Sequence, residues 1–309
     1  MTGAGGFVGQ ALCEALARQG YRVRAALRAP RPMPSHIDET TIVGDIDAQT
    51  DWRAALEGAE LVVHLAAKVH EHGGAAERYT QTNAYGTERL GAQALQAGVR
   101  RLVYLSTIKV NGEVSGQRPV TADDPPRPQD PYAYSKWQGE QFLQQTAAAG
   151  PLEIVIVRPP LVYGPRVRAN FLRLLGWVHS GRPMPFAAVR NRRSLVSVWN
   201  LCDLISRLLQ HPAAPAHVWM VSDGRDCSTA ELIREIALAM HAPARLWPVP
   251  ESLLRLAGAL SGHQAEVTRL CGSLEADIAP TRQRLSWSPP LSMHEGLTRT
   301  VDWYLSATQ

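Results

Sequence analysis

Tyr132 and Lys136 stand four residues apart in the segment DPYAYSKWQGEQ, and this spacing could support proton transfer. On a helix it places the two side chains on one face. An ammonium group near a phenol favours the phenolate and lowers its pKa, so the tyrosine could exchange a proton with a hydroxyl or a ketone near neutral pH. The segment YLST ends about 25 residues earlier, at the end of a predicted parallel strand, and ligands bind at such strand ends.

The chain opens on a glycine-rich loop, TGAGGFVG, which spans residues 2–9. Its GxxGxxG spacing suits a tight turn, a close approach of the backbone to a pyrophosphate and close packing of the following helix. That helix is predicted over 8–19, and its first N–H groups would face the phosphates. We therefore assign to a dinucleotide site Gly3, Gly6, Phe7, Val8 and Gly9.

A strand normally delivers such a loop to its ligand, yet only Met1 precedes Thr2 in this sequence. A missing central strand would leave backbone groups unpaired on both flanking strands, and each buried hydrogen bond left unmade costs about 1–3 kcal/mol. We expect the first strand of the sheet to be missing, and we hypothesise that the natural protein starts upstream of Met1.

The residues that follow two predicted strands bear on the choice of cofactor. ALRAPRP supplies Arg28 and Arg31 but no acid, a pattern that favours the 2′-phosphate of NADP. The alternative is two surface arginines in an arginine-rich chain. Further on, GDI (44–46) ends the next strand, where Asp45 could bind the adenine amino group. The sequence favours NADP slightly and leaves NAD open.

Short, β-branched apolar runs alternate with helical stretches through the first half of the chain. Strands are predicted at 21–27, 40–45, 59–67, 100–107 and 153–160. Helices are predicted at 8–19, 51–57, 76–97 and 134–147. This alternation predicts an α/β fold of the Rossmann type, a doubly wound parallel sheet with helices on both faces.

The pattern changes after Pro165, where helices dominate and strands become short. Helices are predicted at 170–181, 228–241, 251–261, 263–270 and 292–306, and strands at 194–199 and 217–222. We expect a dinucleotide-binding domain over 1–165, to which 194–212 returns. Residues 166–309 then form a smaller mixed substrate domain.

Composition excludes several classes of protein. With 309 residues, 45% apolar and 19% charged, the chain can bury a substantial core. No apolar run approaches the ~18 residues of a membrane span, and no signal-peptide pattern is present. The net charge of +4 is spread along the chain, so we expect no nucleic-acid partner. We expect free thiols in a reducing cytoplasm for the four separated cysteines, Cys13, Cys202, Cys227 and Cys271.

Two smaller features of the composition need interpretation. Of 32 basic residues only Lys68, Lys109 and Lys136 are lysines, which suggests that arginine would not serve at these places. We interpret Lys68 and Lys109 as ordinary residues. The run His70-Glu71-His72 is a poor ligand set for a metal in a glycine-flanked loop, and we expect no metal site.

The chain resembles the extended short-chain dehydrogenases/reductases, in the NAD-dependent epimerase/dehydratase family that acts on sugar nucleotides. The resemblance covers nearly the whole chain. It rests on ordered motifs: TGxxGxxG (2–9), GDI (44–46), HLAA (64–67), Asn83 in QTNAYGT, LST (105–107), YxxxK (132–136), RPPLVYGP (158–165) and RRSLVSV (192–198).

This resemblance implies roles around the cofactor. The glycines would cradle the pyrophosphate, while Asp45 and Ile46 would face the adenine. The cofactor cleft would be lined by Leu65, Ala66, Ala67 and Asn83, and the nicotinamide by Pro159 and Val162.

The same resemblance implies roles around the substrate. Thr107 would bind the reacting sugar oxygen, Tyr132 would be the acid/base, and Lys136 would hold the nicotinamide ribose and tune Tyr132. Asn170 and Arg193 would face the diphosphate of a UDP-sugar, with Arg269 a weaker candidate. Relatives also suggest a homodimer through the helices predicted at 76–97 and 134–147.

The residues after Thr107 limit the choice among the reactions of the family. Dehydratases of the family resemble Thr-Asp-Glu here, whereas this chain has Thr107-Ile108-Lys109, which offers no acid/base pair for water elimination. A 4-epimerase and a 4-ketoreductase acting on a UDP-linked hexose remain. The missing acid near Arg28 favours, slightly, a reductase with exchangeable NADPH over an epimerase with tightly held NAD.

Two further points concern a subgroup of the family and an alternative class of protein. STIKVNGE, RRSLVSVWNL and RLCGSL resemble a bacterial subgroup that makes surface polysaccharides. A different class of protein, a non-catalytic dinucleotide sensor or RNA-binding relative on the same fold, stays a minor alternative. Such relatives lose the tyrosine or the lysine, and both stand here.

Overall fold

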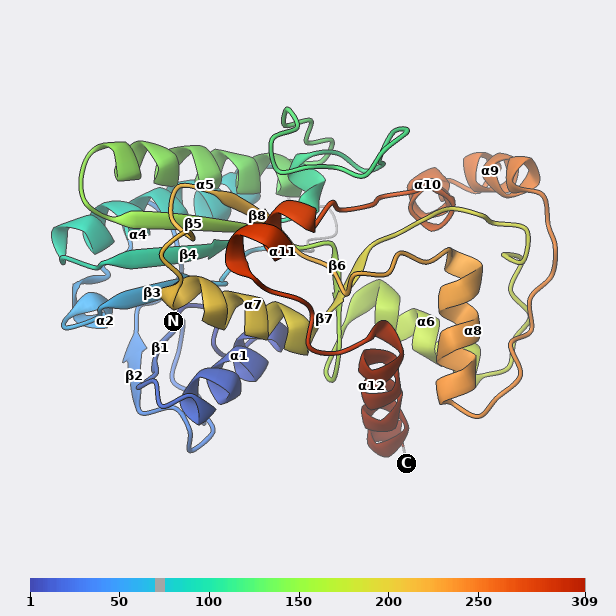
Figure 1. The fold of residues 1–309 in the computed structure, drawn as a ribbon, viewed down its shortest axis with the longest axis horizontal. Helices are drawn as coiled ribbons and strands as arrows, with labels where there is room; N and C mark the ends of the chain where they lie inside the picture. The colour runs from blue at the N-terminus through green and yellow to red at the C-terminus, as the bar shows by residue number, and fades with distance from the viewer. Residues whose placement is uncertain (70–75, 309) are drawn as a thin grey trace.

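The computed structural model describes residues 1–69 and 76–308, and a parallel β-sheet organises the first half of the chain (Figure 1). Four strands form its main part, in the order β3 (Leu61–His64), β4 (Arg101–Leu105), β5 (Glu153–Arg158) and β8 (Val218–Met220). Their register sets Leu61 beside Arg101 and Arg101 beside Glu153. Arg101 and Glu153 form an ion pair of 2.7 Å across this register, at the amino-terminal edge of the sheet.

A second parallel pair, β1 (Arg24–Leu27) and β2 (Glu39–Ile42), lies beyond β3. At the start of the described residues, Thr2 forms single bridges to Ala26 of β1 and to His64 of β3. The Thr2 N–H donates to the carbonyl oxygen of Val63 at 3.0 Å, and the Ala26 N–H donates to the carbonyl oxygen of Met1 at 2.8 Å. These two residues therefore join the β1–β2 pair to the main sheet.

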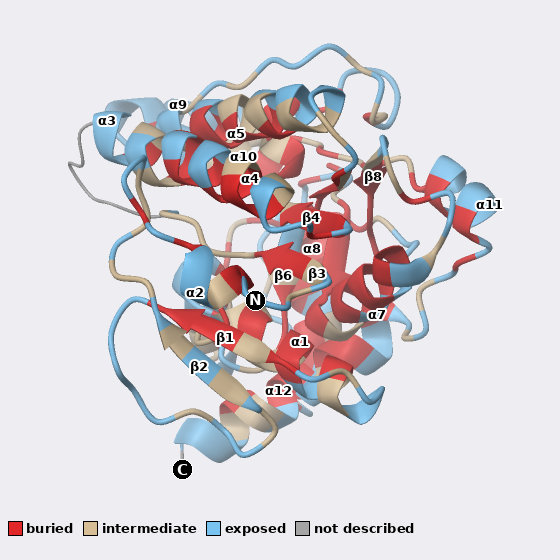
Figure 2. Cartoon of the chain, turned by 90° about the vertical axis from the view of Figure 1, so that its left-hand side faces the viewer, coloured by how far each residue is buried: buried red, intermediate tan, exposed pale blue. Residues whose placement is uncertain are grey.

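Helices cover both faces of the sheet, and the buried residues gather on its strands and on the inner sides of those helices (Figure 2). One face carries α1 (Phe7–Arg18) and α7 (Val198–Gln210), which share a core cluster with Val103 and Val155. The other face carries α4 (Gly86–Gln96) and α5 (Pro131–Ala148). Because successive side chains of a strand alternate between faces, the fully buried run 102–104 serves both layers.

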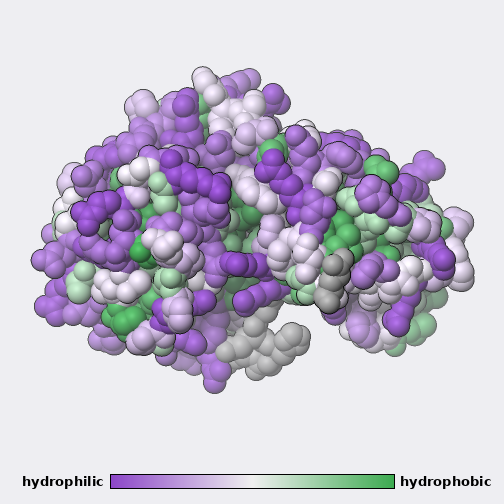
Figure 3. Space-filling view, turned by 90° about the horizontal axis from the view of Figure 1, so that it is seen from below, coloured by the Kyte–Doolittle hydropathy of each residue, from purple (hydrophilic) through white to green (hydrophobic). Residues whose placement is uncertain are grey.

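A smaller lobe is built around a second core cluster. Its helices are α6 (Ala169–His179), α8 (Thr229–Ala239), α9 (Glu251–Leu260), α10 (Gln264–Cys271) and α12 (Met293–Thr308). A short parallel pair, β6 (Leu161–Tyr163) and β7 (Leu195–Ser197), connects it to the sheet. Seen from below, the surface is mostly hydrophilic and is hollowed between the two lobes (Figure 3). The domain boundary at residue 165 stays a prediction.

The structure corrects several expected elements. β6 and α11 (Ala279–Leu285) were not expected, because three residues and the polar heptamer APTRQRL show no periodicity. The helix expected at 76–97 is three pieces: α3 (Ala76–Tyr79), a π-helical segment (Thr80–Tyr85) and α4. Helix α5 begins three residues before the expected start, because Pro131 suits the first turn and Asp130 caps it.

Among residues 1–69 and 76–308, no helix is long and apolar enough to cross a bilayer. The four cysteines are free and buried. His70, Glu71 and His72 lie outside the described residues.

Candidate active site

The glycine loop packs too closely on the segment after β3 to accept side chains. Gly3 has a φ of +68°, and a Cβ there would lie 2.8 Å from the backbone nitrogen of Ala66. A Cβ on Gly9 would lie 2.0 Å from the carbonyl oxygen of Gly3. Gly6 is the N-cap of α1 and has no side chain to occupy the first N–H groups. The helix therefore presents donors and the positive end of its dipole to an anion, which fits a dinucleotide pyrophosphate.

A buried chain of hydrogen bonds connects this loop to the π-helical segment. The hydroxyl of Thr87 donates to the carbonyl oxygen of Asn83 at 2.7 Å, so it must accept from Nε2 of His64 at 3.0 Å. Nδ1 of His64 then accepts from the hydroxyl of Thr2 at 2.7 Å, and that oxygen accepts from the N–H of Ala66 at 3.1 Å. Burial lowers the pKa of His64 to about 3, so the ring is neutral. Sequence reasoning missed His64 and Thr87, because their partners are distant in the chain.

Asn83 is wholly buried, and its amide bonds only protein groups. Oδ1 accepts from the N–H of Lys68 at 2.8 Å, while Nδ2 donates to the Lys68 carbonyl oxygen at 3.0 Å and to Oγ of Ser135 at 2.9 Å. The amide thus ties the loop after β3 to α5. Its place in the cofactor cleft, with Ala66 and Ala67, stays a prediction.

The three predicted catalytic residues come from two neighbouring elements. Thr107 follows β4 and is the N-cap of a short 3-10 helix, Ile108–Val110. Tyr132 lies in the first turn of α5, and Lys136 lies one turn further along. The Thr107 side chain acts to lower the pKa of Tyr132, so the two side chains lie near each other. The structure therefore brings Thr107 and Tyr132 together at the carboxyl end of the sheet, where a substrate oxygen could reach both.

The ionisation of Tyr132 and Lys136 differs from the expectation that the lysine lowers the pKa of the tyrosine. Burial raises the pKa of Tyr132, the Asp130 carboxylate adds to this rise, and the Thr107 hydroxyl opposes it. Burial also lowers the pKa of Lys136 to about 7, against a smaller opposite effect of Glu140. Lys136 is 1% exposed, and its Nζ stands 4.0 Å from the ring centroid of Tyr104. Among the chain's own groups, the effect of burial on the pKa of Tyr132 is therefore larger than the lowering expected from Lys136.

The predicted adenosine end is more open. Nη1 of Arg28 lies 3.5 Å from Oδ1 of Asp45, and both side chains are about four-fifths exposed. Nη1 of Arg31 lies 3.5 Å from the carbonyl oxygen of Gly5 in the glycine loop. The segment around Ile46 packs tightly on α4. Contact of these arginines with the 2′-oxygen of a dinucleotide stays a prediction.

The remaining predicted cofactor residues line the carboxyl ends of β3 and β5. Leu65, Ala66 and Ala67 are half-buried beside the glycine loop. Pro159 is buried, and its carbonyl oxygen accepts from the N–H of Ile108 at 2.9 Å. Val162 is half-buried in β6.

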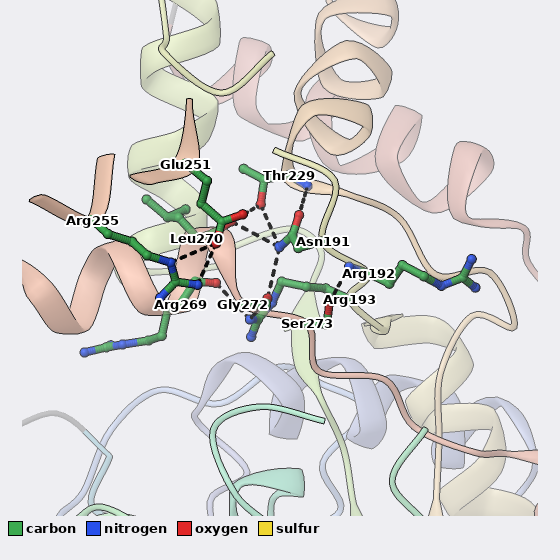
Figure 4. A network of polar contacts seen from close by, with 10 residues as sticks. All are labelled: Asn191, Arg192, Arg193, Thr229, Glu251, Arg255, Arg269, Leu270, Gly272 and Ser273. Carbon is green, nitrogen blue, oxygen red and sulfur yellow. Dashed lines mark hydrogen bonds and ion pairs between the residues drawn. The ribbon is translucent and has the colours of Figure 1, made fainter. Parts of the chain in front are cut away.

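Two of the predicted diphosphate residues, Arg193 and Arg269, lie side by side in the smaller lobe (Figure 4). Nη1 of Arg193 donates to the carbonyl oxygens of Arg269 at 2.8 Å and Gly272 at 3.0 Å. Burial lowers the pKa of Arg193, and Glu113 opposes this. The Asn191 amide binds the same turn through Leu270 and Gly272. The Arg193 side chain therefore packs on the backbone of Arg269, and the role of both residues toward a diphosphate stays a prediction.

A hollow of about 590 Å³ opens beside this turn. Its lining comes from both lobes and includes Val114, Ser115, Arg190, Asn191, Gly272 and Ser273. Asn170, the other predicted residue, is exposed in the first turn of α6, where Oδ1 accepts from Arg173 at 2.5 Å. In the described part of the chain no group of three or more His, Cys, Asp or Glu side chains could hold a metal ion.

The glycine cradle, the parallel sheet and the Tyr132–Lys136 pair together define a short-chain dehydrogenase/reductase of the extended type. A sequence model of the NAD dependent epimerase/dehydratase family matches residues 1–222. The chain belongs to this family, and it is an enzyme of the family's NAD(P)-dependent kind.

Individual relatives match along almost the whole chain. The UDP-glucose 4-epimerase of Vibrio cholerae is 40% identical over 315 residues, which are 99% of this chain and 95% of the relative. An N-acetyl-alpha-D-glucosaminyl-diphospho-ditrans,octacis-undecaprenol 4-epimerase of Escherichia coli O157:H7 is 26% identical, covering 98% and 94% of the two chains. Among solved structures, MoeE5 in complex with UDP-glucose and NAD superposes with a TM-score of 0.81 at 24% identity, covering 100% and 98%. At this identity the structural likeness concerns the fold.

Proposed function

We propose that this enzyme interconverts the C4 epimers of a UDP-linked hexose. The observation that carries the proposal is that Thr107, which follows β4, and Tyr132, in the first turn of α5, lie near each other at the carboxyl end of the sheet. The similarity to a UDP-glucose 4-epimerase at 40% identity supports the reaction type. A place in surface-polysaccharide synthesis is part of the same proposal.

In this mechanism Tyr132 takes the proton of the C4 hydroxyl while Thr107 holds that oxygen. NAD held by the glycine loop and Lys136 would supply a hydride acceptor at C4, and return of that hydride to either face of the 4-keto sugar would leave the cofactor unchanged. Tyr132 then gives the proton back to the C4 oxygen, so that the sugar ends with its original number of hydrogens. Arg193 and Arg269 hold the diphosphate, so the hexose is able to turn over while the nucleotide stays bound.

A 4-ketoreductase is the second candidate, and one observation favours it. The chain's own groups raise the pKa of Tyr132 and so favour its protonated form, which is the proton donor that reduction of a ketone needs. Arg28 and Arg31 would suit the exchangeable NADPH of such an enzyme. The relatives named above are epimerases, so we place epimerisation first.

The deciding experiment is incubation with UDP-glucose, UDP-galactose, their N-acetylated forms and 4-keto UDP-sugars, with and without NADPH. Epimerisation with NAD alone and no net loss of cofactor supports the proposal. Stoichiometric loss of NADPH with a 4-keto sugar supports the reductase. No turnover with any member of the panel, together with salt-sensitive RNA binding, would instead favour a non-catalytic relative.

A further inference from the structure

The three lysines of the chain belong to segments at the same edge of the sheet. Lys68 follows β3, Lys109 follows β4 and Lys136 lies in the second turn of α5, although lysine supplies only three of 32 basic residues. Lys136 belongs to the predicted catalytic set, and the backbone of Lys68 is held by Asn83. Lys109 was expected to be ordinary, and its surroundings show otherwise.

Lys109 joins two carboxylates with one cation. Its Nζ lies 2.6 Å from Oε1 of Glu113 and 2.6 Å from Oδ2 of Asp130. The three side chains are 25%, 18% and 33% exposed, so the cluster is mostly withdrawn from water. A compact ammonium with three donors can bridge two carboxylates at such short range, whereas a planar guanidinium directs its donors in a fixed fork.

The cluster connects the two elements that carry the reactive hydroxyls. The backbone N–H of Lys109 donates to Oγ1 of Thr107 at 3.3 Å, at the turn after β4. Asp130 caps α5 by accepting from the N–H of Ala133 at 2.7 Å through its other carboxylate oxygen. Tyr132 lies between these two bonds, in the first turn of the helix. A displacement of Lys109 would therefore loosen the alignment of Thr107 with Tyr132.

The cluster also sets the charge beside Tyr132. The ring of Tyr132 meets Tyr79 of α3 edge-on at 6.5 Å, and the groups that bear on its ionisation include Asp130 at the start of α5 and Thr107 after β4. Burial acts to raise the pKa of Asp130, but the bonds from Lys109 and Ala133 outweigh it and lower that pKa. On the far side of the cluster Glu113 faces Arg193, which precedes β7.

We propose that Lys109 is a positioning residue, which fixes the first turn of α5 against the Thr107 turn and offsets the negative charge that Asp130 places beside the Tyr132 hydroxyl. The inference rests on the proposed function only in assigning proton transfer to Tyr132.

The test compares Lys109→Met, Asp130→Asn and the double variant. Methionine keeps the length of the side chain without its charge, and asparagine keeps the helix cap. Loss of the cation leaves Asp130 uncompensated, which raises the pKa of Tyr132 and moves the acid limb of the kcat/KM profile to higher pH by about one unit. Asp130→Asn moves it to lower pH, and the double variant returns close to the wild type. The control Arg118→Met removes an exposed ion pair with Asp124 in the same loop and leaves the profile in place.

A second measurement tests this inference independently of which sugar the enzyme accepts. The ring-carbon NMR signal of labelled Tyr132, identified by its absence in Tyr132→Phe, reports ionisation of the NAD-loaded enzyme without any sugar. We expect the same directions of shift there. An unchanged or lowered Tyr132 pKa in Lys109→Met overturns the proposal. If that variant does not fold, an unchanged pKa in Asp130→Asn overturns it instead. Absence of turnover with shifted NMR titrations would overturn the proposed function alone.

Discussion

The strand–helix wall, our name for the predicted catalytic residues Thr107, Tyr132 and Lys136, differs in how its charges are held from the arginine wall, the predicted diphosphate residues Arg193 and Arg269. Lys136 is 1% exposed, and burial moves its pKa to about 7. Arg193 is half-buried as well, yet its guanidinium donates to two backbone carbonyl oxygens and stays a cation. Burial therefore moves the pKa of the cation on the first wall, while hydrogen bonds to carbonyl oxygens anchor the cation on the second.

The sharpest test of this contrast removes the proton-transfer group. Tyr132→Phe should lower kcat by about 10²–10⁴-fold, because only a general acid–base group is lost. Cofactor binding and the melting temperature should change little. Tyr134→Phe is the matched control, since Tyr134 is 47% exposed two residues further on, and it should keep full activity. More than about a tenth of the wild-type rate in Tyr132→Phe would contradict the assignment.

The arginine wall should respond in binding rather than in chemistry. Arg193→Met should raise KM for the UDP-sugar by about 10- to 100-fold and change kcat less, since one charged hydrogen-bonding group contributes about 1.5–3 kcal/mol. It should also lower the melting temperature, because the carbonyl oxygens of Arg269 and Gly272 lose their donor. Arg192→Met, which removes an exposed ion pair with Glu275, should do neither. A loss confined to kcat would place Arg193 with the chemistry instead.

Low pH should lower the free energy of unfolding through His64, the buried histidine behind the glycine loop. The folded protein keeps His64 neutral down to a pKa of about 3, whereas the unfolded chain binds that proton near 6.5. The free energy of unfolding should therefore fall as pH drops from 6.5 towards 3, by up to about 1.4 kcal/mol per pH unit from this residue. Denaturant titrations of His64→Gln across that window should show a shallower fall than the wild type. The exposed control His263→Gln should follow the wild-type slope, and equal slopes in all three proteins would contradict the prediction.

The smallest effect is expected at the open adenosine end. Arg28→Asp should weaken NADPH by about tenfold, through loss of one charge-assisted contact to the 2′-phosphate, and weaken NADH much less. Fluorescence titrations with both nucleotides measure the difference. Arg22→Asp, at another exposed arginine paired with Glu39, should leave both affinities unchanged. Equal losses of affinity for NADPH and NADH in Arg28→Asp would show that Arg28 is an ordinary surface residue without a contact to the 2′-phosphate.

Local patterns in the sequence were enough to predict the parallel sheet and one helix that carries both Tyr132 and Lys136, whereas the role of Thr107 came from the family resemblance. The local patterns act over short spans: alternating strands and helices, a glycine spacing, and two residues one helical turn apart. They could not show that Arg193 binds the carbonyl oxygens of Arg269 and Gly272, because that contact depends on the packing of the smaller lobe. The same holds for the buried bonds of His64 and for the bridging role of Lys109, which each join separate elements.

The π-helical segment Thr80–Tyr85 makes the helical stretch 76–96 sensitive to the deletion of a residue. It accommodates one residue more per turn than an α-helix, and it is held by the buried amide of Asn83. Deleting one residue before Asn83 would let a regular helix form, but it would turn Tyr79 by about 100° relative to Asn83. Tyr79 would then leave the ring of Tyr132. An engineer who replaced this segment with a regular helix would therefore lose the contact between Tyr79 and Tyr132.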